Sequence, residues 1–378
     1  MTKKLLRITT ASVSLDVLLK GQLAFLNQYY EVVGLASGEE VLKKVSEREG
    51  IRTVEVNMKR EISLLADLAS LWAMIRTISR EKPFIVHAST PKGSLLGMLA
   101  AWLCRVPHRI YTVTGLRFET ATGSFRQLLI AVEKLTCRLA TRVIPEGEGV
   151  KRTLLQEKIT RKPLTVILHG NINGIDLGYF QRSSEVERKA SALRKKVFTF
   201  CYVGRMTRDK GINELIHAFA QLHKTCTGVH LLLVGPLEQE LDPISETALE
   251  MLHHHPAITF TGFQEDVRPY LAASDAFVFP SYREGFPNVV MQAGAMGLPS
   301  IVTDISGSNE IIIQGQNGII IPPKDQHALL EAMKYFAEHQ DTVTSMATSC
   351  RPLIASRYEQ KMVWEEILHM YQSLEKIT

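Results

Sequence analysis

The sequence predicts an α/β protein with two Rossmann-like, doubly wound parallel-sheet domains that face a cleft. Three observations lead to this fold class. The 378 residues exceed what one hydrophobic core usually organises. Short apolar stretches of strand type alternate with segments of helical periodicity. This alternation is interrupted by a polar stretch near the middle of the chain and then restarts, which indicates two parallel sheets in succession.

The expected first domain covers 1–178. Its strands are short apolar runs, and its helices carry apolar residues three or four positions apart. The expected strands are 5–10, 31–37, 84–89 and 108–115, and the expected helices are 15–28, 62–80 and 94–104. The segment 164–176 closes this half. The charged segment 182–196, polar throughout, is interpreted as the boundary between the domains.

The expected second domain covers 179–354 and repeats the same alternation of strands and helices. Its expected strands are 198–205, 229–235, 258–262, 276–280 and 299–304, and its clearest helix is 212–225. A final amphipathic helix, within about 355–378, can pack back on the first domain. In open parallel sheets, ligands bind beyond the carboxyl ends of the strands. Residues that follow these strands are therefore the first candidates for function.

The composition excludes several classes of protein. A hydrophobic content of 45% and a charged content of 22% are ordinary for a globular protein. The five cysteines are scattered without a C-x-x-C pair, which argues against a disulfide framework. Arg7 and Asp16 interrupt the apolar core that a signal peptide needs. The longest apolar run, 94–104, is about half of a membrane span. We therefore expect a cytoplasmic protein.

The charge is unevenly distributed along the chain. Residues 1–178 hold 26 Lys and Arg against 16 Asp and Glu, whereas residues 179–378 hold 18 against 23. A basic first half suits an anionic partner, but a solvated basic face explains it equally well. Basic residues form no single run and no nucleic-acid signature accompanies them, so no nucleic acid is expected as a partner. The functional interpretation is a phosphorylated ligand at an anionic membrane surface.

The segment 202–216 places two cations at a strand end. Gly204 and Arg205 follow an expected strand, and Lys210 comes just before an expected helix. Glycine allows close backbone approach, a helix N-terminus offers unpaired N–H groups, and Arg and Lys add positive charge. This combination suits a diphosphate. A surface loop with two solvated cations is the alternative.

The segment 281–304 places Glu284 in a loop after an apolar strand. A helix is expected from about Pro287, and Gln292 lies eight positions after Glu284, which puts the two on one side. A carboxylate accepts hydrogen bonds from sugar hydroxyls, and a glutamine amide both donates and accepts, as the cis-diol of a ribose requires. The alternative for Gln292 is a polar residue on a partly exposed side of a helix.

Together these segments resemble the retaining glycosyltransferases of family four, which have the GT-B fold. The matching segments of the second half are 203–211, 274–304, 307–312 and 317–325, around the family's E-x7-E pattern. In the first half, segments 12–26, 90–103, 107–116 and 173–176 resemble bacterial members that build capsular or other lipid-linked polysaccharides. The resemblance implies a hexosyltransferase that moves a sugar from a nucleotide diphosphate donor to a lipid-linked glycan with retention of configuration. Within this family the expected donor is a UDP-sugar.

The resemblance also implies roles for individual residues. Arg205 and Lys210 would bind the donor diphosphate and Glu284 would contact the donor sugar, which makes these three the expected catalytic residues. The remaining implied contacts are with other parts of the donor. Gly21 of the first domain and Gly204 would face the phosphates, and the amides of Phe286 and Asn288 would reach the sugar or a phosphate. The backbone of Phe263 would meet the base, Gln292 the ribose, and Glu310 would lie near the nucleotide.

Two positions depart from the family pattern. Gln292 stands where the family has its second acid, which leaves the strength of ribose binding open. Ser89 stands where similar sequences often carry the second histidine of H-x-H, so His87 is the remaining candidate near the acceptor. A satisfied buried histidine is the alternative for His87.

Other catalytic patterns are not found in the sequence. No D-x-D pair occurs, so we expect metal-independent transfer without a cofactor, the nucleotide sugar being a substrate. The histidines 253–255 are interpreted as an exposed loop. A dinucleotide-dependent oxidoreductase is one alternative, but it would need G-x-G-x-x-G after the first strand, where no glycine occurs. A GT-B scaffold without turnover that acts as a binding partner is the other. The expected location is cytoplasmic, peripheral on the inner face of the plasma membrane.

Overall fold

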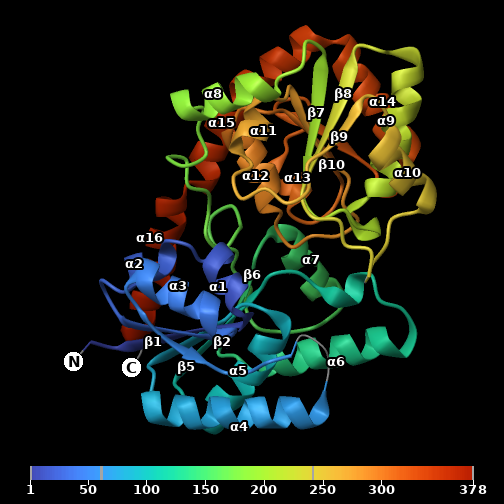
Figure 1. Cartoon of the computed structure of the whole chain (residues 1–378). Coiled ribbons are helices and arrows are strands. Elements are labelled where there is room, and N and C mark those ends of the chain that lie inside the picture. Colours follow the sequence, from blue (N-terminus) through green and yellow to red (C-terminus); the bar gives the residue numbers. More distant parts are fainter. Residues whose placement is uncertain (1, 60–62, 241, 377–378) are drawn as a thin grey trace. The chain divides into compact units, whose positions relative to one another are not determined.

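The computed structural model describes residues 2–59, 63–240 and 242–376, and Figure 1 shows the chain. The chain divides into two compact units: unit 1 comprises Met1–Gly174 and Gln360–Thr378, and unit 2 comprises Ile175–Glu359. In the described residues each unit contains one six-stranded parallel sheet, which confirms the predicted fold class. Ile62 and Ile377, the end residues of two expected helices, lie outside the described residues.

The sheet of unit 1 has the strand order β3-β2-β1-β4-β5-β6. Its strands are β1 (Lys4–Ala11), β2 (Glu31–Ser37), β3 (Arg52–Glu55), β4 (Ile85–Ala88), β5 (His108–Val113) and β6 (Arg142–Pro145). The central strands are mostly apolar on both faces because helices cover both sides of a doubly wound sheet. Arg7 of β1 is a buried charged residue and pairs in register with His87 of β4.

Helices cover the two faces of this sheet and form two separate apolar cores. One core includes buried residues of α4 (Leu64–Glu81), α5 (Pro91–Leu103), α6 (Gly123–Leu139) and α7 (Glu148–Gln156). The other includes residues of α1 (Ser12–Leu18), α2 (Gln22–Leu26), α3 (Glu39–Glu49) and α16 (Gln360–Glu375). A short 3₁₀ helix at Arg117–Glu119 precedes α6.

The last helix, α16, belongs to unit 1 although the chain reaches it from unit 2. Val363, Ile367 and Tyr371 are buried in the core that α16 shares with α1, α2 and α3. The Tyr30 hydroxyl donates a hydrogen bond of 2.6 Å to Glu375 of this helix. Segments more than 300 residues apart in the chain therefore complete one face of the first sheet.

The sheet of unit 2 has the order β12-β11-β10-β7-β8-β9. Its strands are β7 (Phe198–Val203), β8 (Val229–Val234), β9 (Ile258–Phe260), β10 (Ala276–Phe279), β11 (Ser300–Thr303) and β12 (Gly318–Ile321). Its helices are α8 (Ser184–Leu193), α9 (Ile212–Thr225), α10 (Glu246–His254), α11 (Arg268–Ala272), α12 (Asn288–Ala295), α13 (Ser308–Ile311), α14 (Gln326–Glu338) and α15 (Gln340–Tyr358). One continuous core packs this sheet against its helices.

Two local predictions were wrong. The polar segment expected as a boundary forms α8, because Ser183 caps its first turn and Val186 and Ala190 supply a buried stripe. The histidines at 253 and 254 form the last turn of α10 rather than a loop, and both are exposed. Among the described residues, no helix is long and apolar enough to cross a membrane.

Candidate active site

The candidate residues of unit 2 follow the carboxyl ends of four strands. Gly204 and Arg205 follow β7, Phe263 follows β9, Glu284 follows β10, and Glu310 lies on α13 after β11. The strands are parallel, so their carboxyl ends meet at one edge of the sheet, where ligands bind in folds of this kind. The structure thus brings these predicted residues to one edge.

A partly buried ion pair joins the loops after β7 and β10. Lys210 ends a short 3₁₀ helix, Arg208–Lys210, and its Nζ donates to Oε1 of Glu284. The Ser281 hydroxyl donates to the same oxygen at 2.8 Å. The side chains of Lys210 and Glu284 are 15% and 18% exposed, so both charges remain accessible from solvent. A cation and a carboxylate therefore stand side by side where a phosphate and a sugar could be contacted.

Two glycines let the loops around this pair approach each other closely. Gly211 has φ +72°, and a Cβ there would lie 2.1 Å from the carbonyl oxygen of Pro280. Gly307 has φ +76°, and a Cβ there would lie 2.6 Å from the carbonyl oxygen of Gly285. Any other residue at either position would be strained and would displace the loop that carries Glu284. The loops after β7, β10 and β11 are therefore packed backbone against backbone.

Arg205 is half-exposed and held by a residue that the sequence reasoning missed. Its Nη1 lies 2.8 Å from Oε2 of Glu238, which follows β8. The Tyr202 hydroxyl donates to the Arg205 carbonyl at 2.9 Å, and a Cβ on Gly204 would lie 2.5 Å from that hydroxyl. Glu238 stands in an irregular loop without a recognisable motif, so no sequence signal identified it.

The charges at this edge influence each other. Burial raises the pKa of Tyr202 well above its usual value, and the carboxylates of Glu284 and Asp209 add to that effect. Burial also opposes the charged form of Asp209, but the Thr207 hydroxyl and the charges of Lys210 and Arg205 lower the pKa of Asp209 overall. Tyr202 therefore stays neutral and Asp209 stays ionised near pH 7.

Helix α12 begins at Asn288, one residue after the expected start, and carries Asn288 and Gln292, while Phe286 lies two residues before it. The Phe286 side chain is buried, and its ring centroid lies 5.5 Å from that of Tyr358. Asn288 and Gln292 are one turn apart and share a face of the helix. Both are partly exposed. The first residues of α12 and this face are thus accessible beside the Glu284 loop.

Glu310 and Phe263 occupy contrasting surroundings. The Glu310 carboxylate accepts the backbone N–H of Gly307 at 3.1 Å, and the Glu310 carbonyl accepts the Tyr358 hydroxyl at 3.0 Å. It therefore stabilises the start of its own short helix, a contact that the sequence did not predict. Phe263, which follows β9, is 73% exposed, so its side chain contributes little to the fold.

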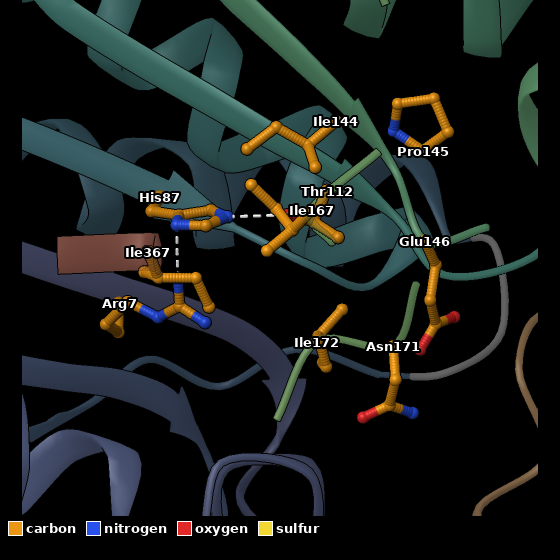
Figure 2. A pocket seen from close by; sticks show the side chains of 10 residues that line it. All are labelled: Arg7, His87, Thr112, Ile144, Pro145, Glu146, Ile167, Asn171, Ile172 and Ile367. Carbon is orange, nitrogen blue, oxygen red and sulfur yellow. Dashed lines mark hydrogen bonds between the residues drawn. The ribbon is translucent and has the colours of Figure 1, made fainter. Parts of the chain in front are cut away.

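His87 of unit 1 is a satisfied buried histidine, the second of its two interpretations (Figure 2). Its Nδ1 accepts from the Arg7 guanidinium, so the proton must be on Nε2, which donates to the Thr112 hydroxyl at 2.7 Å. The Tyr371 hydroxyl lies 2.5 Å from Nδ1. Burial, helped by the Arg7 charge, lowers the pKa of His87 well below 6.5. The adjoining cavity has about 10 Å³, the room of one water molecule, so an acceptor contact by His87 is not supported.

Gly21 also has a structural role that differs from the expected phosphate contact. Its N–H donates to the Glu49 carboxylate at 3.0 Å. With φ +79°, it lies at the start of α2, and a Cβ there would lie 2.6 Å from the indole ring of Trp364. The glycine is needed because α16 packs directly on it. Its backbone donor is therefore already used within unit 1.

The sequence predicted transfer without a metal ion. Within the described parts of the chain, no group of three or more His, Cys, Asp or Glu side chains could hold a metal ion. Metal-independent transfer stays a prediction, because an activity measurement alone can test it.

Comparisons with known proteins give the family. Residues 25–170 match the family model described as "Glycosyl transferase 4-like domain", and residues 197–339 match "Glycosyl transferases group 1". The capsular polysaccharide biosynthesis glycosyltransferase CapM of Staphylococcus aureus is 32% identical over 99% of this chain and 98% of its own length. The UDP-Gal:alpha-D-GlcNAc-diphosphoundecaprenol alpha-1,3-galactosyltransferase of Escherichia coli is 28% identical over 82% of this chain and 81% of its own.

A solved structure agrees with the fold. Anabaena HepE in complex with UDP and glucose superposes with a TM-score of 0.82 at 19% identity, covering 99% of this chain and 100% of HepE. This likeness supports the GT-B fold, and the family matches exclude the oxidoreductase alternative. The chain belongs to the group 1 glycosyltransferases and has the GT-B fold.

Proposed function

We propose that this protein transfers a hexose from a UDP-sugar to a lipid-linked glycan during capsular or other surface polysaccharide synthesis. In this proposal the sugar keeps its anomeric configuration, as in the retaining glycosyltransferases of family four. The transfer needs no metal or other cofactor. The relatives support the setting, since CapM is named for capsular polysaccharide biosynthesis and the E. coli relative for a diphosphoundecaprenol acceptor.

The observation that carries the proposal is the ion pair of Lys210 and Glu284 beside Arg205. Arg205 and Lys210 supply two cations at the edge of the sheet, and α9 begins two residues after Lys210, so its N-terminus adds partial positive charge. A diphosphate bound there would be neutralised by protein groups alone. Glu284 would then exchange part of its contact with Lys210 for hydroxyls of the donor sugar.

The proposed reaction proceeds on one face of the sugar. The acceptor hydroxyl attacks the anomeric carbon from the side on which the diphosphate leaves, and the bond between that carbon and the phosphate oxygen breaks. The departing phosphate takes the acceptor's proton, so no protein nucleophile is required. Arg205 and Lys210 stabilise the charge that develops on the leaving group, which is where electrostatic stabilisation has its largest effect on rate.

Unit 1 is proposed to bind the acceptor, although not through His87. The carboxyl ends of β1 and β4 carry hydroxyl side chains, including Ser89, which is buried. Among the described residues its Oγ has no hydrogen-bond partner. A buried hydroxyl without a partner is a candidate contact for a ligand that opens the site when it binds. We also propose that the enzyme works at the anionic inner face of the plasma membrane, to which its basic first half is attracted.

A thermal-shift screen of UDP, GDP, ADP and dTDP sugars tests the donor assignment. A ligand at 100 times its dissociation constant should stabilise the protein by about 2.7 kcal/mol. We expect one or more UDP-hexoses to raise Tm in the parent and to do so much less in Lys210→Ala. Stabilisation by another nucleotide class alone would contradict the UDP assignment, and stabilisation by none would contradict the donor site.

A further inference from the structure

The helices α4, α5 and α6 leave an apolar surface on one face of unit 1. Of the seventeen large hydrophobic side chains that are exposed among the described residues, eight lie on these three helices. The six most exposed of them are called here the apolar patch: Leu65, Leu68, Trp72, Trp102, Leu103 and Leu128. Leu65 is 83% exposed and Trp72 is 64% exposed. Apolar side chains gathered in this way usually mark a binding surface.

The residues of the patch lie on helices that pack against one another, α4 on α5 and α5 on α6. On α4 the residues Leu65, Leu68 and Trp72 are three or four positions apart, which places them on one stripe. The end of α5 packs on α4, where the Cys104 thiol lies 3.3 Å from the Ser79 hydroxyl. The C-terminal end of α5, which carries Trp102 and Leu103, therefore lies next to the C-terminal half of α4. Figure 1 shows α4, α5 and α6 together on one side of the first sheet.

The exposed charges on these three helices all have one sign. Among the described residues, the exposed charged side chains of these helices are Arg76, Arg80, Lys134 and Arg138. The Arg76 guanidinium lies 5.6 Å from the centre of the Trp72 ring.

The acidic side chains of the same helices are occupied elsewhere. Asp67 pairs with Lys92 at 2.8 Å. Glu81 is buried beside Arg52 at 2.6 Å, and Glu133 accepts the Tyr111 hydroxyl at 2.8 Å. No exposed acid on the described helices therefore offsets the four cations.

We propose that the apolar patch and its four cations form the surface by which this protein lies on an anionic lipid bilayer. The proposal rests on the proposed function, whose acceptor is lipid-linked, and it assigns the membrane contact to particular helices. Exposed Trp and Leu enter the headgroup boundary, where indole rings are favoured, while Lys and Arg pair with anionic headgroups. A surface that used charge alone would not need the two tryptophans.

The placement of the patch suits a lipid-linked acceptor. The helices α4 and α5 begin after the carboxyl ends of β3 and β4, so Leu65 and Leu68 stand near the edge of the sheet where Ser89 lies. An acceptor whose tail stays in the bilayer could thus present its head group to that edge.

The first test measures sedimentation with vesicles of phosphatidylcholine, with and without about one third phosphatidylglycerol. The patch variant is Leu68→Glu/Trp72→Glu, and the matched control is Leu155→Glu/Val197→Glu, two exposed apolar residues outside the patch. We expect the parent to prefer anionic vesicles, the patch variant to lose about tenfold or more in partition, and the control to stay within about twofold. Equal partition of the patch variant and the parent would overturn the proposal.

Tryptophan fluorescence tests insertion separately, since the chain has three tryptophans and two are in the patch. The third, Trp364, is held by Asn173 at 2.7 Å. Anionic vesicles should shift the parent's emission to shorter wavelength, and Trp72→Phe/Trp102→Phe should abolish the shift. An unchanged shift in that variant would contradict insertion at the patch.

Two further readouts separate this proposal from its alternatives. All variants should bind UDP as the parent does, because the patch lies outside the donor site. A failure of the parent to bind UDP would instead contradict the proposed function. If light scattering shows a parent dimer that the patch variant dissociates while vesicle binding is unchanged, the patch is a contact between copies and the membrane proposal is wrong.

Discussion

Removing the Lys210 ammonium group should reduce turnover far more than stability. In Lys210→Ala the leaving diphosphate loses one of two cations, and losing one such contact typically costs about 3 kcal/mol of barrier. This corresponds to a fall in kcat of about a hundredfold. The same change leaves Glu284 without its ion-pair partner, although the Ser281 hydroxyl still donates to it.

The stability cost follows from the exposure of the pair. Exposed ion pairs contribute about 0.2–1 kcal/mol, and breaking a fully buried pair costs about 3–5 kcal/mol. With Lys210 and Glu284 at 15% and 18% exposure, we expect an intermediate loss of about 1–2 kcal/mol. For a unit of this size Tm should fall by a few degrees.

The matched control is Arg208→Ala, which removes a cation from the same 3₁₀ helix. The Arg208 side chain is 67% exposed and pairs with Asp242 at 3.1 Å, away from Glu284. The assay follows UDP release from the UDP-sugar that gives the largest thermal shift. We expect Arg208→Ala to stay within about twofold of the parent. If Lys210→Ala is also within about twofold, or if both variants fall equally, the leaving-group role of Lys210 is wrong.

The remaining predictions concern the ribose, metal and pH. Gln292→Leu should raise the donor KM because two ribose hydroxyls lose their hydrogen-bond partner. Gln292→Glu should leave the donor KM level or lower it, because a charge-assisted hydrogen bond is stronger. Unchanged UDP affinity in Gln292→Leu would place the ribose elsewhere. Activity should survive excess EDTA, and a complete loss that Mn²⁺ or Mg²⁺ restores would contradict leaving-group stabilisation by Arg205 and Lys210. Burial raises the pKa of Glu133 from 4.5 to about 7 against the opposing Tyr111 hydrogen bond, so the folded state holds the proton more tightly. Stability should therefore decline between about pH 4.5 and 7, by roughly 2–3 kcal/mol. Urea titrations of Glu133→Gln should show a flatter decline, and an equally steep one would exclude this carboxyl as its source.

The second sheet and its edge could be predicted from the sequence because their signals are local. Apolar strands, the glycine before Arg205 and the helix start after Pro287 each depend on a few neighbouring residues. The structure places Glu284 after β10 and Gln292 on α12, as the spacing indicated. The ion pair to Lys210 could not be predicted, since it needs the order of β7 and β10 in the sheet.

The errors in unit 1 arise from contacts between distant parts of the chain. His87 is buried with Tyr371, which lies 284 positions later, and Gly21 packs on Trp364. The sequence does not show that α16 packs on these two residues, so His87 and Gly21 were both interpreted as ligand contacts. In unit 2, the segment 182–196 was interpreted as a boundary because it is polar, and its only buried helical stripe consists of Val186 and Ala190.

Transfer of labelled hexose to lipid tests the central claim most directly. The protein is incubated with a UDP-hexose labelled in the sugar and with membranes that carry undecaprenyl-linked glycans, and label is counted in the organic extract. We predict that at least one UDP-hexose labels the lipid with the parent, and that Lys210→Ala lowers the initial rate about a hundredfold. If the parent binds UDP but leaves the lipid unlabelled with every UDP-hexose, the account is contradicted and the scaffold without turnover is favoured.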